Sequence, residues 1–267
     1  MVQEAAERLM AGRLNPDARK MITNLVNLAA AASVIDPDTG APFTPLAAVS
    51  ERRVSLTRAA VAEFKTQPHT PELMTSVFQR ISAERGAKVG LVVEVTSFPF
   101  SQEQLAASEA KGNRFGYLPA GLETQADRHK LGRIFPKMQS QSVQEGNVVT
   151  NDASPSGWFE YEAAVDAPYT KTTEAQLMAR LGKAGRRLLS ENQYIIASQD
   201  SKLFTGHYLD EFKPNGFYTY VRLGSRRDGR LVDAYFYTDG RLRVRSDLKP
   251  VNHYSNLGAR SSGVNIA

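Results

Sequence analysis

The sequence of 267 residues contains no cysteine, a single tryptophan and no long hydrophobic run. The absence of cysteine excludes disulfides, thiolate metal sites and a cysteine nucleophile. No stretch of about 18 apolar residues is present, so no membrane span and no membrane partner is predicted. Residues 21–35 resemble a signal peptide only in part, because polar residues interrupt them and their apolar spacing indicates a core-facing helix. We therefore expect a protein of the cytoplasm or of a virion.

Several motifs of known chemistry are also missing. The four histidines show no metal-ligand spacing, and neither a phosphate-binding glycine loop nor a Gly-x-Ser-x-Gly elbow occurs. Asp36, Asp38 and Gly40 begin like a calcium loop, but its twelfth position is Ala47 instead of glutamate, which favours a plain turn. The sequence therefore predicts no cofactor and no catalytic residue.

Two groups of carboxylates leave a metal-dependent, nuclease-like enzyme as one alternative. Glu94 interrupts an apolar run over residues 89–95, and Glu160 and Glu162 project from one face of a predicted strand. Acidic clusters can hold Mg²⁺ for phosphoryl chemistry when they converge. The alternation along this strand also predicts a simple solvent-facing edge without any metal.

The composition is that of a globular protein, with 42% hydrophobic and 23% charged residues. Residues 1–86 have helical periodicity, including a helix that begins with Thr70 as N-cap and Pro71 in its first turn. Strand periodicity then dominates residues 87–267. The sequence predicts an α+β fold, with an N-terminal helical part and a mixed part ending in a three-stranded antiparallel meander, and the two parts could share one core.

The mixed part contains elements of both types. We predict strands over residues 89–95, 158–165 and 194–197 from their apolar runs and alternation. Thr173 and Gln176 form a capping box, which predicts a helix over residues 173–190. The last residues, 252–267, form a polar tail without periodicity.

The meander over residues 217–245 alternates aromatic and arginine residues. A three-residue loop ending at Gly240 pairs Phe236 with Leu242 and Tyr235 with Arg243, which separates apolar from charged side chains. A four-residue loop over residues 226–229 continues this pattern and places Phe217 on the apolar face. The opposite face then carries four tyrosines and four arginines: Tyr218, Tyr220, Tyr235, Tyr237, Arg222, Arg241, Arg243 and Arg245.

Positive charge is concentrated in the same third of the chain. Residues 171–267 contain 16 lysines and arginines against 9 acidic residues, whereas residues 134–170 contain 1 against 5. The predicted helix adds a basic stripe of Arg180, Lys183 and Arg187. Tyrosine can stack on bases and arginine can neutralise phosphates, so this face predicts a non-enzymatic protein that binds single-stranded nucleic acid. The alternative is a structural subunit of a large assembly, such as a viral particle or a secretion machine, in which the same residues contact other protein subunits.

Overall fold

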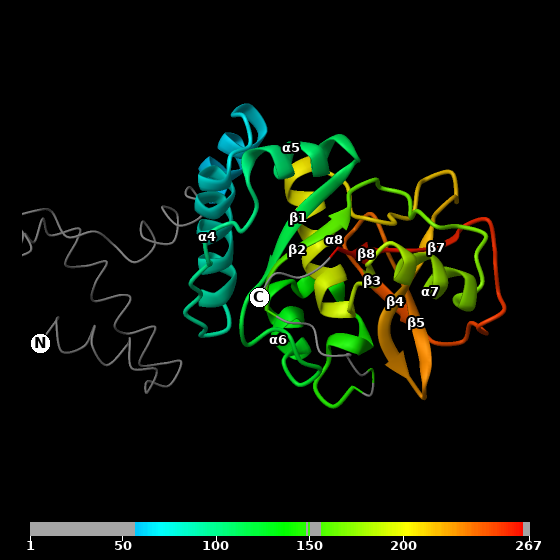
Figure 1. The fold of residues 1–267 in the computed structure, drawn as a ribbon. Helices are drawn as coiled ribbons and strands as arrows, with labels where there is room; N and C mark the ends of the chain where they lie inside the picture. The colour runs from blue at the N-terminus through cyan, green and yellow to red at the C-terminus, as the bar shows by residue number, and fades with distance from the viewer. Residues whose placement is uncertain (1–56, 148, 150–155, 264–267) are drawn as a thin grey trace, which may run out of the picture. The chain divides into compact units, whose positions relative to one another are not determined.

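The computed structural model describes residues 57–147, 149 and 156–263 and has the predicted α+β fold (Figure 1). The chain divides into two units, residues 1–59 and 60–267, and the fold described below is that of the second unit. The predicted helix over residues 21–35 lies outside the described residues. Within the described part, no helix has both the length and the apolar character to cross a membrane.

Helices and a strand pair form the first layer. A helix over residues 57–66 precedes α4 (Pro71–Ala87), where Thr70 accepts a hydrogen bond from the Leu73 amide as predicted for an N-cap. Helix α5 (Gln102–Ala110) follows, and β1 (Asn113–Leu118) pairs with β2 (Gly157–Glu162) in antiparallel register. Phe78 of α4 packs edge-on against Trp158 of β2. The helical part thus shares a hydrophobic core with residues beyond position 86. A domain boundary at residue 86 stays a prediction.

The prediction of a strand over residues 89–95 is wrong, because residues 89 and 90 belong to a turn and residues 91–95 form no regular structure. No described strand pairs with it, and the side chain of Gln79 takes the place of a neighbouring strand. The Gln79 amide donates to the Val93 carbonyl at 2.9 Å and accepts from the Val95 amide at 2.7 Å. Val93 and Val95 are buried while Val92 is fully exposed, so the run is not buried throughout as its valine-rich composition predicts.

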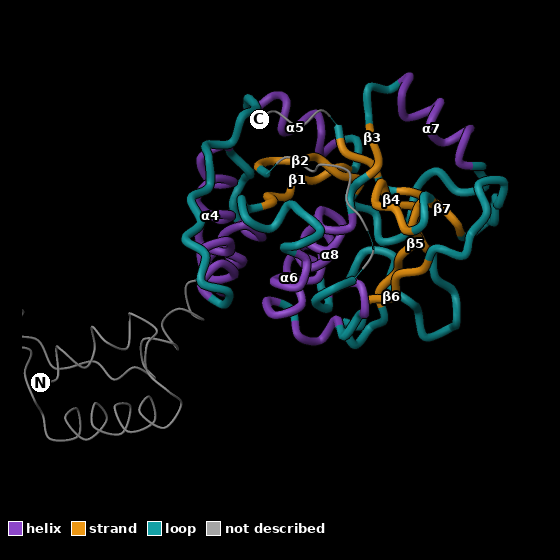
Figure 2. Tube along the Cα trace, turned by 90° about the horizontal axis from the view of Figure 1, so that it is seen from below, coloured by secondary structure: helices purple, strands orange, loops and turns teal. Residues whose placement is uncertain are grey.

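Helix α8 (Glu191–Thr205) lies between the β1–β2 pair and the second sheet (Figure 2). The predicted strand over residues 194–197 is therefore wrong. Ser190 and Gln193 form a capping box that starts the helix, and the helix is buried nearly all round, so its apolar run lacks the amphipathic pattern. Three shorter elements lie between β1 and β2 in the sequence: α6 (Arg128–Ile134) and the 3₁₀ turns η1 (Pro136–Met138) and η2 (Gln141–Val143). Helix α6 contacts α8 and both turns.

The predicted helix over 173–190 is shorter than expected. Its capping box is confirmed, but α7 (Glu174–Lys183) ends before Gly185, which has a φ of 63°. The chain then forms β3 (Arg187–Leu188). A left-handed glycine is a common helix terminator, because other residues adopt that conformation at a cost.

The second sheet contains the predicted meander and one further strand. Strands β4 (Tyr220–Arg227), β5 (Arg230–Phe236) and β6 (Leu242–Arg245) are antiparallel, and β7 (Leu257–Ala259) joins β4 in parallel. The register of β5 with β6 is confirmed, including the pairs Phe236 with Leu242 and Tyr235 with Arg243. β8 (Ser261–Ser262) pairs with β3, so the polar tail supplies two strands.

The loop between β4 and β5 differs from the prediction. Asp228 and Gly229 form a two-residue turn with φ angles of 51° and 75°, as a type I′ turn requires. An irregularity between Arg222 and Arg226 then restores the predicted pairing of Val221 with Ala234. This irregularity shifts the register of β4 against β5 by two residues. Because the shift is an even number, the paired side chains of β4 keep the faces that were predicted for them.

The apolar face of the meander packs on α8. Phe236, Ala234 and Val221 are fully buried in the largest core cluster, and the ring of Phe236 stacks on Tyr208 at a centroid distance of 4.9 Å. The prediction fails for Phe217, which precedes β4 and is 46% exposed.

Candidate binding groove

The tyrosine and arginine face of the meander is largely covered. Tyr220, Tyr235 and Arg222 are 7%, 5% and 2% exposed, so the prediction that they face solvent is wrong. Tyr220 and Tyr235 belong to a small core with Leu257 of β7, against which Leu248 also packs. The cause is non-local, because the chain after β6 returns across this face to form β7.

Arg222 and Tyr220 show what this burial does to their chemistry. Arg222 donates to the backbone carbonyls of Thr172 at 2.9 Å and Asn252 at 2.6 Å, so it holds two loops together. Burial lowers the pKa of Arg222 and raises the pKa of Tyr220 to about 12. Neither side chain is presented to a ligand.

Two tyrosines stay half-exposed at the edge of this face. Tyr218 stacks on Phe212 at a centroid distance of 4.7 Å, and Phe212 also stacks on Tyr237 at 5.8 Å. The hydroxyls of Tyr235 and Tyr237 lie 3.1 Å apart. Burial raises the pKa of Tyr235, whereas the hydrogen bond with Tyr235 lowers the pKa of Tyr237. The two exposed rings therefore belong to one aromatic cluster instead of a row of separate stacking platforms.

The arginines of β6 and its turn differ in how they are neutralised. Arg245 pairs with the buried carboxylate of Asp233 at 2.9 Å, and Arg241 pairs with the exposed Asp239 at 2.8 Å. Arg243 is exposed and forms no ion pair with any described residue. It therefore carries the least compensated charge on this strand.

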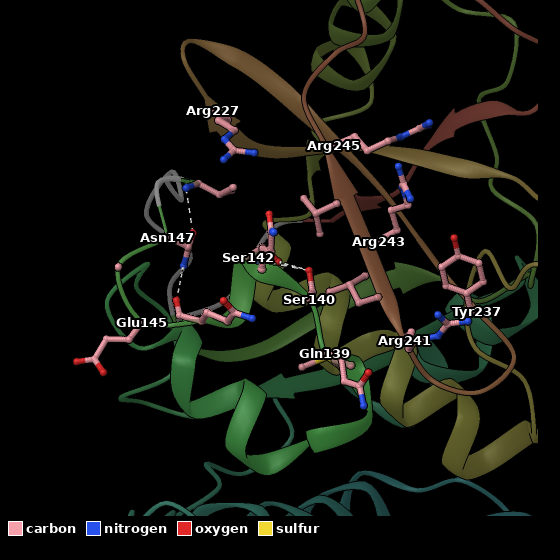
Figure 3. Close-up of a pocket in the computed structure, with 17 residues that line it drawn as sticks. Gln139, Ser140, Ser142, Glu145, Asn147, Arg227, Tyr237, Arg241, Arg243 and Arg245 are labelled. Carbon is pink, nitrogen blue, oxygen red and sulfur yellow. Dashed lines mark hydrogen bonds between the residues drawn. The ribbon is translucent and has the colours of Figure 1, made fainter.

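A groove of roughly 760 Å³ runs between β6 and residues 138–147 and 149 (Figure 3). Its lining contains four arginines and one glutamate: Arg227, Arg241, Arg243, Arg245 and Glu145. Figure 3 shows Tyr237, Arg243 and Arg245 on one side of β6, and Ser140, Ser142 and Asn147 on the other. Strand β6 and the turn that precedes it thus contribute most of the positive charge that lines the groove.

A buried polar cluster holds the wall opposite β6. The Arg128 guanidinium is fully buried and donates to the Asn147 side chain at 3.2 Å, the Val149 carbonyl at 2.7 Å and the Asn192 side chain at 2.8 Å. It also lies 3.3 Å from a carboxylate oxygen of Glu191, which is fully buried in the first turn of α8. Burial raises the pKa of Glu191, and the charge of Arg128 offsets part of this rise.

The basic stripe predicted from the sequence does not reach this groove. Arg180 and Lys183 lie on α7 and Arg187 lies on β3, and all three are exposed. Arg180 sits over the ring of Tyr169 at 4.9 Å. None of the three lines the groove, so the structure does not bring them together with the arginines of β6.

Two of the three carboxylates considered for metal binding, Glu160 and Glu162, already have partners. Arg186 donates to Glu160 at 2.7 Å and lies 3.1 Å from Glu162, and Ser261 also donates to Glu162. The third carboxylate, Glu94, is exposed and comes from a segment that precedes both α5 and β1, far in the sequence from Glu160 and Glu162. Among the described residues, no group of three or more metal-ligating side chains occurs.

Sequence reasoning missed Arg227 and the polar wall of the groove. Arg227 is the last residue of β4, and the wall residues Gln139, Ser140, Ser142 and Asn147 come from a polar segment without periodicity. Only the density of Gly, Ser, Asn and Gln marked that segment, which predicts loops and no particular neighbour. Comparison of the chain with protein-family models, curated proteins and solved structures finds no match.

Proposed function

We propose that the protein binds single-stranded nucleic acid along the groove between β6 and residues 138–147 and 149. The observation that carries this proposal is the gathering of Arg227, Arg241, Arg243 and Arg245 around one groove with a single glutamate. A strand of phosphates is the polyanion that such a channel suits, and electrostatic attraction supplies most of the affinity when no sequence is read.

Phosphate contacts carry more of this binding than base stacking. Of the predicted tyrosines only Tyr237 lines the groove, and Tyr218 is half-exposed beside it. A stacked base contributes about 1–3 kcal/mol. Arg241 lies over the Tyr237 ring at 4.7 Å and Phe212 stacks on the same ring, so a base must displace one of them to stack there and adds little to the attraction of the arginines. The cytoplasm or a virion, where such a ligand is present, is the proposed location.

The test is binding of a fluorescently labelled single-stranded oligonucleotide followed by anisotropy. Replacing Arg227 and Arg243 together by alanine removes the two groove arginines that form no ion pair with described residues, so we expect weaker binding. Arg230→Ala is the matched control, because Arg230 is exposed on the neighbouring strand β5 but does not line the groove.

Two results would overturn the proposal. One is the absence of oligonucleotide binding at low salt. The other is an equal loss of binding in the Arg230→Ala control and in the groove variant, since that would indicate general attraction to a basic surface instead of a defined groove.

The second candidate function, a structural subunit that contacts other proteins, is supported by one specific observation. Strand β6 stands at the end of the sheet order β6-β5-β4-β7 and adjoins the groove. An open strand edge is a common site of protein association.

A further inference from the structure

The free edge of β6 presents backbone hydrogen-bonding groups to the groove. In the β5–β6 hairpin, the Tyr237 amide donates to the Arg241 carbonyl at 2.8 Å, so residues 237 and 241 form a hydrogen-bonded pair. Such pairs recur at every second residue, which directs the backbone groups of Arg243 and Arg245 toward β5. The amides and carbonyls of Leu242 and Val244 consequently point away from β5, and no other described strand pairs with β6.

The side chains along this edge alternate in character. Leu242 is buried and Val244 partly buried on the core side, whereas Arg241, Arg243 and Arg245 project from the opposite face. A strand added beside β6 would place every second side chain next to the arginines and the others next to Leu242 and Val244. Charge complementarity then calls for acidic residues at the first set of positions and apolar residues at the second.

We propose that the β6 edge is a docking site for an extended polypeptide segment in which acidic and apolar residues alternate. Main-chain hydrogen bonds to Leu242 and Val244 bind the backbone of the segment, and ion pairs with Arg243 and Arg245 give specificity for its acidic residues. A second copy of β6 is a poor occupant, because edge-to-edge pairing would bring the two rows of arginines together and like charges across a strand pair are destabilising. The site goes beyond the proposed binding of nucleic acid and does not depend on it.

The probe is a labelled heptapeptide with blocked ends that alternates valine and glutamate, Val-Glu-Val-Glu-Val-Glu-Val. Its control has the same composition with the three glutamates adjacent. We expect the alternating peptide to bind at least about tenfold more tightly, because only it satisfies both sets of neighbours at once. Equal binding of the two peptides would overturn the proposal, since attraction by charge alone does not depend on the order of residues.

Methylation of the peptide backbone tests the main-chain hydrogen bonds without changing the protein. One derivative carries N-methyl groups on two valine amides and the other on two glutamate amides. Alternate amides of a strand point to opposite edges, so one derivative must lose binding and the other must keep it. Loss of about tenfold in only one derivative supports the proposal, whereas an equal response of both contradicts it.

Val244→Pro tests the same contact from the side of the protein. Proline removes the Val244 amide that faces the groove, and proline is tolerated on the outer side of an edge strand. We expect this variant to lose peptide binding and to retain oligonucleotide binding, which needs the arginines instead of this amide. Unchanged peptide binding would overturn the docking site. Failure of the wild-type protein to bind the oligonucleotide would count against the proposed nucleic-acid function only, so the two failures are distinguishable.

Discussion

The salt dependence of oligonucleotide binding can be calculated from the groove. Each arginine that neutralises a phosphate of a single strand contributes about 0.7 to the slope of the logarithm of affinity against the logarithm of salt concentration. All four groove arginines together give a slope of about −2.8, and Arg227 and Arg243 alone give about −1.4. Raising the salt from about 50 to about 200 mM should then weaken binding between about 7-fold and about 50-fold.

The ion pairs of Arg241 and Arg245 determine where in this range the slope of the protein lies. Arg241 and Arg245 must exchange Asp239 and Asp233 for phosphates, so a slope nearer the lower limit is expected. Arg243→Ala should make the slope less steep by about 0.7, because this arginine has no described acidic partner to leave. Asp239→Asn should make it steeper, because Arg241 is then released and both side chains of that pair are exposed.

The assay is fluorescence anisotropy at four or more salt concentrations, with Arg230→Ala as the control for a cation outside the groove. The reasoning is refuted if the slope of the wild-type protein is near zero. It is also refuted if Arg243→Ala and Arg230→Ala change the slope equally, since the groove would then have no special role.

Three further predictions concern stability, measured by urea unfolding. Burial raises the pKa of Glu160, but hydrogen bonds from Ser108 and an arginine outweigh it and hold this pKa below its ordinary value. Its stabilising contribution is therefore present at neutral pH and lost as the pH falls below about 4.5, so Glu160→Gln should destabilise the protein at pH 7 and much less in acid. Gly258→Ala should destabilise it, by roughly 1–3 kcal/mol, because the new methyl carbon in the buried strand β7 would clash with the Pro168 carbonyl oxygen and the Ala167 side chain. Gly182→Ala should instead stabilise it by about 0.5–1 kcal/mol, because this position in α7 has open space and alanine favours the helix.

The hairpin between β5 and β6 could be predicted from the sequence because its determinants are local. Gly240 fixes the turn, and the alternation of Phe236, Leu242 and their neighbours fixes the register. The helix starts at Thr70 and Thr173 could also be predicted from the sequence, since each N-cap acts within the first turn of its helix.

The burial of the tyrosine face could not be predicted in this way. Its covering residues, Phe212, Leu248 and Leu257, are separated from Tyr235 by up to 23 positions and follow no periodic pattern that points to it. The apolar run at 194–197 was ambiguous for a related reason, because short buried strands and fully buried helices have the same composition. For the candidate site, the arginines of β6 could be identified from the sequence, but the polar residues that form the opposite wall of the groove could not.

The position of Arg260 has a consequence for the order of assembly during synthesis. Its guanidinium is fully buried, binds Asp210 at 2.7 Å and also donates to the carbonyls of Glu162, Ala164 and Val165. Until residue 260 has left the ribosome, the Asp210 carboxylate cannot form its ion pair with Arg260, and burying this carboxylate without a partner is unfavourable. We therefore expect nascent chains that already contain the whole meander to stay protease-sensitive around residue 210, and to become resistant only after the β7 and β8 segment has emerged.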